Sequence, residues 1–187
     1  MKLRLATAGD AAAIAAIYAP YVTASAISFE MEPPDAAAMA TRIESAGGLY
    51  PWIAACDDDG DDGDDGAVRG YAYASAFRLR RAYRFAVETT VYVDRDAQGR
   101  GIGRPLYAML LETLEAQGFA QAIGAVTLPN PASVRLHESL GFARAGTYEK
   151  VGFKLGQWHS VGLWQRPLAP LSDSPAEPKK VADVWKD

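Results

Sequence analysis

The feature that most constrains the fold lies in mid-chain, where a strand pattern leads into a glycine-rich loop and then a helix pattern. RFAVETTVYV, residues 84–93, has the β-branched and aromatic content of a strand. Gly99, Gly101 and Gly103 follow, and RPLYAMLLETLEAQ is typical of a helix that runs to about Gln117. A glycine-rich turn that opens a helix can hold a phosphate group on its backbone N–H groups. The sequence therefore predicts a strand–loop–helix unit that binds a phosphate-bearing ligand.

Further strands and helices are expected on both sides of this unit. A helix capped by Asp10 is expected to be interrupted at Pro20, Asp35 is expected to cap a second helix, and Asn130 a later one that runs to Leu140. The other strands are expected at 2–6, 51–56, 67–77, about 121–126, about 144–153 and 158–166. This order gives hairpins, one strand–helix–strand crossover and a final hairpin. It predicts an α+β fold with a mixed, mostly antiparallel sheet flanked by helices, not a doubly wound fold.

The chain of 187 residues is expected to form one domain over residues 1–168. Residues 169–187 are rich in proline and charge, which predicts a disordered C-terminal tail. The acidic stretch DDDGDDGDDG is expected to be a solvated, mobile hairpin loop, with no other role evident in it. A calcium loop starting at Asp58 would need a glutamate at its twelfth position, where Arg69 stands.

Bulk properties exclude several classes of function. The net charge of −4 argues against a general nucleic-acid binder. No apolar run reaches the ~20 residues that cross a bilayer, and the N-terminus shows no signal peptide, so we expect no membrane partner. Cys56 is the single cysteine, which excludes an intrachain disulfide and favours the cytoplasm. Small-molecule chemistry is the expected function.

Two phosphate-loop chemistries fail on spacing. A P-loop needs a lysine after its second glycine, and the chain has no lysine between Lys2 and Lys150. A dinucleotide-binding loop needs G-x-G-x-x-G in the first βαβ unit, whereas the segment from Gly99 to Gly103 has different spacing and lies in mid-chain.

The loop Gln98-Gly99-Arg100-Gly101-Ile102-Gly103 instead has the pattern Q/R-x-x-G-x-G/A and resembles that of the GNAT superfamily of N-acetyltransferases. The resemblance covers most of residues 1–168 and is strongest to the phosphinothricin-type acetyltransferases. It is carried by YVTASAISFEMEPP, RLRRAYRFAVETTVYV, LEAQGF, LPNPASVRLHESLGF and GFKLGQWHSVGLWQR. It implies acetyl-CoA as donor, a small amino-acid-like amine as acceptor and a homodimer. No metal is expected.

Glu88 is a carboxylate in the middle of an otherwise apolar strand, and it shares a face with Thr90 and Tyr92. Burial raises the pKa of such a group, which suits a general base that removes the proton of the acceptor amine. The alternative is a structural salt bridge to a nearby arginine.

The resemblance implies that the backbone of this strand and the glycine loop bind the cofactor. The properties of the glycine loop support its part in cofactor binding, because exposed backbone N–H groups and the helix dipole favour a pyrophosphate, and an arginine can add positive charge. The expected cofactor-binding residues are Val91, Tyr92, Val93, Gln98, Gly99, Arg100, Gly101, Ile102, Gly103, Arg104, Asn130 and Ser133.

His137 shares a helix face with Ser133, four residues earlier. The resemblance places it near the departing thiolate, with three roles open: general acid, proton relay or substrate contact. A lone helical histidine can also be purely structural, as Asn130 can be a plain N-cap.

Four arginines stand within one stretch of seven residues, although the chain as a whole is acidic: Arg78, Arg80, Arg81 and Arg84. We expect two of them to hold an acidic group of the substrate, because guanidinium binds carboxylate or phosphinate with two hydrogen bonds, whereas a solvated strand edge is the alternative. The resemblance places Arg78, Arg80, Tyr83 and Glu88 at the substrate, with Phe29 as a pocket wall.

The predicted function is direct transfer of the acetyl group of acetyl-CoA to the α-amine of a small amino-acid analogue such as phosphinothricin, methionine sulfoximine or methionine sulfone. Cys56, in an apolar strand, is expected to be inert. Trp158, His159 and Trp164 are expected to pack in the core or at a dimer contact. Two alternatives stay open: an acetyltransferase for another small amine or an antibiotic, and a non-catalytic sensor that binds acyl-CoA.

Overall fold

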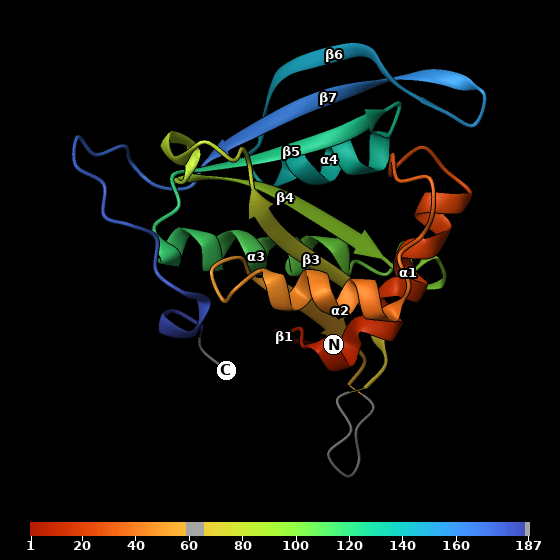
Figure 1. Ribbon diagram of the computed structural model, residues 1–187, viewed down its shortest axis with the longest axis horizontal. Coiled ribbons are helices and arrows are strands. Elements are labelled where there is room, and N and C mark those ends of the chain that lie inside the picture. Colours follow the sequence, from red (N-terminus) through yellow and green to blue (C-terminus); the bar gives the residue numbers. More distant parts are fainter. Residues whose placement is uncertain (59–65, 186–187) are drawn as a thin grey trace.

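The computed structural model of the protein describes residues 1–58 and 66–185, and it is built on a seven-stranded sheet (Figure 1). In chain order its main elements are β1 (Lys2–Leu5), α1 (Ala11–Thr23), α2 (Ala36–Ser45), β2 (Trp52–Cys56), β3 (Val68–Ala76), β4 (Ala86–Val93), α3 (Gly103–Gln117), β5 (Gln121–Leu128), α4 (Pro131–Ser139), β6 (Ala143–Lys154) and β7 (Gln157–Pro167). The strands are ordered β1-β2-β3-β4-β5-β7-β6. Only β4 and β5 pair in parallel among these neighbours. The predicted mixed, mostly antiparallel α+β fold with one crossover is confirmed.

Helices cover both faces of the sheet. Leu106, Leu110 and Leu114 of α3 pack in one core, and Leu136 of α4 lies against the same core. Ile14 and its neighbours on α1 form a second core with Met39 of α2. The side chains of β4 alternate between these two cores: Val87 belongs to the α3 core, whereas Tyr92 lies against the α1 core.

Helix α1 does not end at Pro20, which corrects the prediction of an interruption there. Proline lacks an N–H donor and its ring crowds the carbonyl four residues earlier, but Tyr21 and Val22 continue the helix because both side chains are buried. The Pro20 carbonyl accepts from the N–H of Ala24 at 3.1 Å and from the Arg95 guanidinium at 2.8 Å. The helix therefore carries one more buried turn than the sequence predicts.

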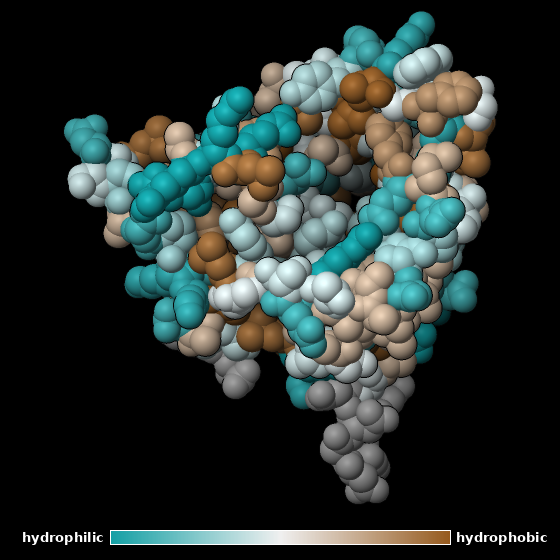
Figure 2. Space-filling view, viewed as in Figure 1, coloured by the Kyte–Doolittle hydropathy of each residue, from teal (hydrophilic) through white to brown (hydrophobic). Residues whose placement is uncertain are grey.

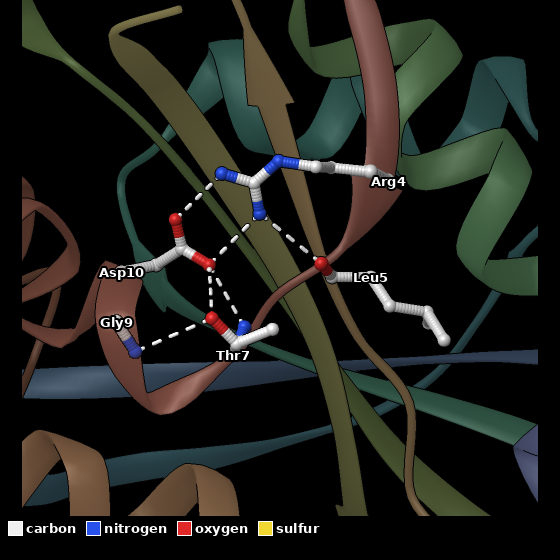
Figure 3. Close-up of polar contacts among 5 residues, drawn as sticks. All are labelled: Arg4, Leu5, Thr7, Gly9 and Asp10. Carbon is white, nitrogen blue, oxygen red and sulfur yellow. Dashed lines mark hydrogen bonds and ion pairs between the residues drawn. The ribbon is translucent and has the colours of Figure 1, made fainter. Parts of the chain in front are cut away.

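Asp10 lies at the start of α1 but makes no capping hydrogen bond to that helix, which corrects a second prediction. Its carboxylate instead accepts two hydrogen bonds from Arg4, at 2.7 and 2.8 Å, and one from the Thr7 N–H at 2.8 Å (Figure 3). These bonds hold the pKa of Asp10 below its ordinary value, although burial opposes them. The carboxylate therefore ties β1 to the start of α1, and this stabilisation is lost as the pH falls through the lowered pKa.

The remaining helix ends follow their sequence signals. Asp35 Oδ1 accepts from the N–H of Ala38, Asn130 Oδ1 accepts from the N–H of Ser133, and Gly118 adopts the left-handed conformation after α3. Much of the predicted acidic hairpin loop, residues 59–65, lies outside the described residues.

The C-terminal segment differs from the disordered tail expected over 169–187. Its Lys179 N–H donates to Gln117 at 2.8 Å, its Val181 N–H donates to Gly48 at 2.8 Å, and Val181 is buried. The apolar residues that hold this segment, Val181 and Trp185, are too few to give a periodic signal among its prolines and charges. Residues 186 and 187 lie outside the described part.

Candidate functional site

The site begins where two strands of the sheet separate. β4 and β5 pair only from Ala86↔Gln121 to Glu88↔Ile123. Beyond these three pairs, β4 stays with β3 as far as Val93, and β5 stays with β7 as far as Leu128. The two halves of the sheet therefore diverge (Figure 1), and the space-filling view shows a hollow over this region (Figure 2). We call the space between residues 89–93 and 124–128 the β4–β5 gap.

Backbone groups of β4 face this gap. The Asp94 N–H donates to Arg69 of β3, and Val93 is paired with Gly70. Because hydrogen-bonded and non-hydrogen-bonded pairs alternate along antiparallel strands, the N–H and C=O groups of Val91 and Val93 point away from β3 and toward β5. The early end of the β4–β5 pairing leaves this edge open to a ligand with amide groups.

The glycine loop lies at the wide end of the gap. Gly99 and Gly101 have φ values of 76° and 80°, and a Cβ added at either would meet no atom within 4 Å. Glycine is favoured here for its left-handed backbone, which leaves open space above the loop. A pocket of about 630 Å³ spans the loop, β4 and α4. Its lining includes the predicted residues Val91, Tyr92, Val93, Gln98, Gly99, Gly101, Ile102, Gly103, Arg104, Asn130 and Ser133.

The two arginines of the loop differ in their placement. Arg100 is exposed and is the one predicted cofactor-binding residue outside the pocket lining. Arg104 lines the pocket, but its guanidinium donates to the carbonyl of Ser139 at 3.0 Å and to the hydroxyl of Ser139 at 2.8 Å. Arg104 thus joins the start of α3 to the end of α4.

Tyr21 is a pocket residue that sequence reasoning missed. From α1, its hydroxyl donates to the Val93 carbonyl and accepts from the Gln98 side-chain amide at 2.9 Å. It therefore fixes the end of β4 against the glycine loop. No spacing motif joins residue 21 to residue 93, and the only sequence signal is an aromatic residue on the apolar side of a helix.

Glu88 lies at the last paired position before the gap opens, on the face of β4 that looks toward α1 and α2. Its half-buried carboxylate makes no hydrogen bond or ion pair within residues 1–58 and 66–185, so the alternative of a structural salt bridge is not observed there. Burial raises the pKa of Glu88, and the more distant charge of Arg78 opposes this effect. A carboxylate with a raised pKa binds a proton more readily than an ordinary glutamate does.

The arginine-rich segment divides into two pairs. Arg84 and Arg81 bind Glu177 of the C-terminal segment at 2.8 and 3.6 Å. Arg78 and Arg80 have no such ion pair among the described residues, and they line an open pocket of about 540 Å³ with Tyr83. This fits the expectation that two of the four are available to an acidic ligand.

Phe29 does not lie in that arginine pocket. Its ring lies against Gly152, because a Cβ added to that glycine would come within 2.2 Å of the ring. The centroids of the Phe29 and His159 rings are 6.2 Å apart. Phe29 therefore contacts the end of the β6–β7 hairpin, and the structure does not bring it together with Arg78, Arg80 and Tyr83 in one pocket.

His137 is buried on the α3 side of the sheet and also borders a small cavity of about 50 Å³ at the gap. Its Nδ1 lies 2.8 Å from the Ser133 carbonyl, which can only accept, so Nδ1 carries a proton. Its Nε2 lies 3.1 Å from the Tyr107 hydroxyl, which in turn lies 2.7 Å from the Thr89 hydroxyl. Burial lowers the pKa of His137, which favours the neutral ring that accepts from Tyr107.

Gly124 of β5 makes room for this histidine. A Cβ at residue 124 would lie 2.4 Å from His137 Nε2, closer than any side chain tolerates. Thr89, Tyr107 and Gly124 were not predicted from the sequence, because their link to His137 exists only after α3, α4 and the two strands have packed.

The remaining residues that the sequence analysis singled out lie in β2 and in the β6–β7 hairpin. Cys56 is fully buried in β2, Trp164 is buried in the α3 core, and His159 donates to the Lys154 carbonyl at 3.0 Å. Trp158 is 61% exposed. Over residues 1–58 and 66–185, no group of three or more His, Cys, Asp or Glu could hold a metal, and no helix has the length and apolarity to cross a membrane.

Comparisons with known proteins agree with this geometry. The family model described as an acetyltransferase (GNAT) domain matches residues 3–161. A phosphinothricin N-acetyltransferase of Streptomyces viridochromogenes is 40% identical over 98% of this chain and 94% of its own length. An L-methionine sulfoximine/L-methionine sulfone acetyltransferase of Pseudomonas paraeruginosa is 33% identical over 93% of this chain and 98% of its own. The crystal structure of a phosphinothricin acetyltransferase from Sinorhizobium meliloti in complex with AcCoA superposes with a TM-score of 0.86, at 38% identity over 96% of this chain and 97% of that one.

The fit between Gly124 and His137 gives a prediction for stability. Gly124→Ala should lower the free energy of unfolding by about 2 kcal/mol, because the new methyl group displaces the buried imidazole. The same substitution in a His137→Ala background should change it by less than about 0.5 kcal/mol, because the space is then vacant. Urea unfolding of the four proteins measures both steps, and an equal loss in the two backgrounds would contradict the contact.

Proposed function

The chain belongs to the GNAT family of acetyltransferases and is an acetyl-CoA-dependent N-acetyltransferase, and on that premise we propose that its acceptor is the α-amine of a small amino-acid analogue of the phosphinothricin, methionine sulfoximine or methionine sulfone type. The observation that carries this proposal is Glu88. It is a half-buried carboxylate without an ion-pair partner in the described chain, at the point where the β4–β5 gap opens. The names of the relatives support the class of acceptor.

The residues around the gap fit coenzyme A. The open space above Gly99 and Gly101 accommodates a pyrophosphate near backbone N–H groups and the start of α3. The outward N–H and C=O groups of Val91 can pair with the amides of the pantetheine arm, and one N–H can polarise the thioester carbonyl. The Val93 carbonyl already accepts from Tyr21, so at that residue only the N–H is left for the ligand. When bound, the cofactor supplies the acetyl group.

Glu88 acts as the general base in this proposal. The amine nitrogen forms a bond to the carbonyl carbon of the thioester, the carbon–sulfur bond breaks, and the proton of the amine passes to the Glu88 carboxylate. The raised pKa of Glu88 suits this role, because the group binds the proton more readily than an ordinary glutamate would.

His137 has a supporting role. The neutral ring presents a lone pair to Tyr107 and its one proton to Ser133, so it offers no proton of its own to the gap. Of the three roles left open by the sequence, this geometry favours a relay through Tyr107 and Thr89 over direct protonation of the thiolate. Ser133 and Asn130 border both the pocket and the small cavity, between the relay and the cofactor.

Arg78 and Arg80 are assigned to the carboxylate or phosphinate of the acceptor, with Tyr83 beside them and Phe29 as a more distant wall. Their positive charges attract the acidic group of an amino-acid acceptor and repel a polyamine. Another small amine or an antibiotic is the runner-up acceptor. A non-catalytic acyl-CoA sensor is less favoured, because it would not need a partly buried carboxylate at the edge of the gap.

We also propose a homodimer in the cytoplasm. Tyr148, Val151, Phe153, Leu155 and Trp158 expose apolar surface at the end of the β6–β7 hairpin, where Figure 2 shows brown and tan residues. Burial of this patch against a second copy would account for its composition. Light scattering should give about twice the chain mass of 20.0 kDa, and the mass of a single chain would contradict the dimer.

The base assignment predicts a pH profile. The kcat/KM of the wild-type enzyme should rise with pH through a pKa above the ordinary glutamate value of 4.5, because the base works only when ionised. Glu88→Gln should lower kcat/KM by about 100-fold near neutral pH and remove this rise. Steady-state thiol release measures both, and a variant with the wild-type profile would contradict the assignment.

The acceptor assignment predicts a substrate order. Thiol release from acetyl-CoA should be fast with phosphinothricin, methionine sulfoximine or methionine sulfone and slow with polyamines. Arg80→Ala should raise the KM of the acidic acceptors by about tenfold or more. Acetylation of polyamines alone would overturn the arginine assignment.

Mass spectrometry during turnover should find no acetyl group on Cys56, because the transfer is direct.

A further inference from the structure

Lys154, the last residue of β6, has an ammonium group buried inside the protein, with 4% of the residue exposed. Its Nζ donates to three backbone carbonyls: Val22 at 2.5 Å, Ser28 at 2.7 Å and Glu30 at 2.7 Å. A buried charge is tolerated only when its hydrogen-bonding groups are satisfied, and here every proton of the ammonium has an acceptor. Val22 lies in the last turn of α1, where carbonyls lack helical partners and the helix dipole favours a cation.

The three carbonyls belong to the C-terminal end of α1 and to a short segment that follows it, Ile27–Glu30. The same segment is also bound by side chains of α1 and α2. The Tyr18 hydroxyl lies 2.6 Å from the Ser28 hydroxyl and donates to Glu30 at 3.0 Å, and Arg42 binds both oxygens of Glu30 at 2.8 and 2.9 Å. The Ile27–Glu30 segment has no helix or strand of its own, so these side chains and Lys154 determine its position.

This segment forms part of the mouth of the β4–β5 gap. Ile27 lines both the cofactor pocket and the small cavity, together with Thr90 and Tyr92 in the latter. Thr90 and Tyr92 lie two and four residues beyond Glu88 on the same face of β4. Phe29 reaches across to Gly152, so the segment closes the space between α1 and the β6–β7 hairpin.

We propose that Lys154 is a positioning residue for the acceptor: by holding the Ile27–Glu30 segment through backbone carbonyls, it sets the wall along which the amine reaches Glu88. The proposal rests on the proposed function. It differs from a general role in stability because Lys154 belongs to the β6–β7 hairpin and two of its three hydrogen bonds end on this wall. Of the residues that line the cofactor pocket, Ile27 alone belongs to this segment, whereas the others come from α1, β4, the stretch 97–104 and the stretch 130–136.

The matched control is Gln117, another buried polar side chain that donates hydrogen bonds to backbone carbonyls. Its Nε2 donates to Leu49 at 2.8 Å and to Lys179 at 2.7 Å, at the C-terminal end of α3 and away from the gap. Lys154→Met and Gln117→Met each replace such a group with an unbranched apolar chain. Both should lower the melting temperature, whereas only Lys154→Met should change the wall.

The experiment measures the KM of each substrate and hydrogen–deuterium exchange of residues 24–35 in the wild type and both variants. Lys154→Met should raise the acceptor KM by about tenfold, leave the acetyl-CoA KM within about twofold, and speed exchange over 24–35. Gln117→Met should do none of these. A Lys154→Met enzyme with wild-type acceptor KM and exchange, or with equal increases in both KM values, would overturn the proposal.

Lys154→Arg covers the case in which the methionine variant does not fold. Arginine keeps the charge and the donors but is larger, so it should shift the segment and raise the acceptor KM by about threefold or more, with the acetyl-CoA KM unchanged. An unchanged acceptor KM would again overturn the proposal. If the wild type acetylates no amino-acid analogue, the proposed function fails, whereas the exchange measurements still test the contact itself.

Discussion

The early end of the pairing between β4 and β5 is the constraint on which the rest of the structure depends. Three parallel pairs hold the two strands together, and each then follows a different neighbour. One result is a row of outward backbone groups on β4. A second is that the glycine loop, which follows β4, and α4, which follows β5, stand on opposite sides of one opening (Figure 1).

The same strand separates two kinds of proton chemistry. Glu88 looks toward α1 and α2, whereas Thr89, the next residue, looks toward α3 and meets Tyr107. Burial favours the neutral form of both titratable groups, because it raises the pKa of Glu88 and lowers that of His137. The roles proposed for them, a base on one side of β4 and a neutral relay on the other, would suit a reaction in which a proton leaves the amine on one face and a thiolate departs nearby.

The sequence predicted the features that local chemistry decides. Strand alternation placed Glu88 and Val91 on opposite faces, the cap signals located Asp35 and Asn130, and the glycine pattern indicated the loop that borders the pocket, whereas the other residues of the pocket lining were expected only from the family resemblance. What could not be predicted depends on contacts between distant segments. Tyr21 on Val93, Lys154 on the end of α1 and Gly124 beneath His137 join residues with no common periodicity. Pro20 failed as a helix end for the same reason, since burial of Tyr21 and Val22 outweighs one lost hydrogen bond.

The most direct test of the account is a crystal structure with coenzyme A and a small amino-acid analogue bound together. We expect the pantetheine arm along the outer edge of β4 in the β4–β5 gap, the pyrophosphate over Gly99–Gly103, and the amine within hydrogen-bonding distance of Glu88. An amine bound away from Glu88, or a pantetheine arm outside the gap, would contradict the central claim that the divergence of β4 and β5 builds the active site.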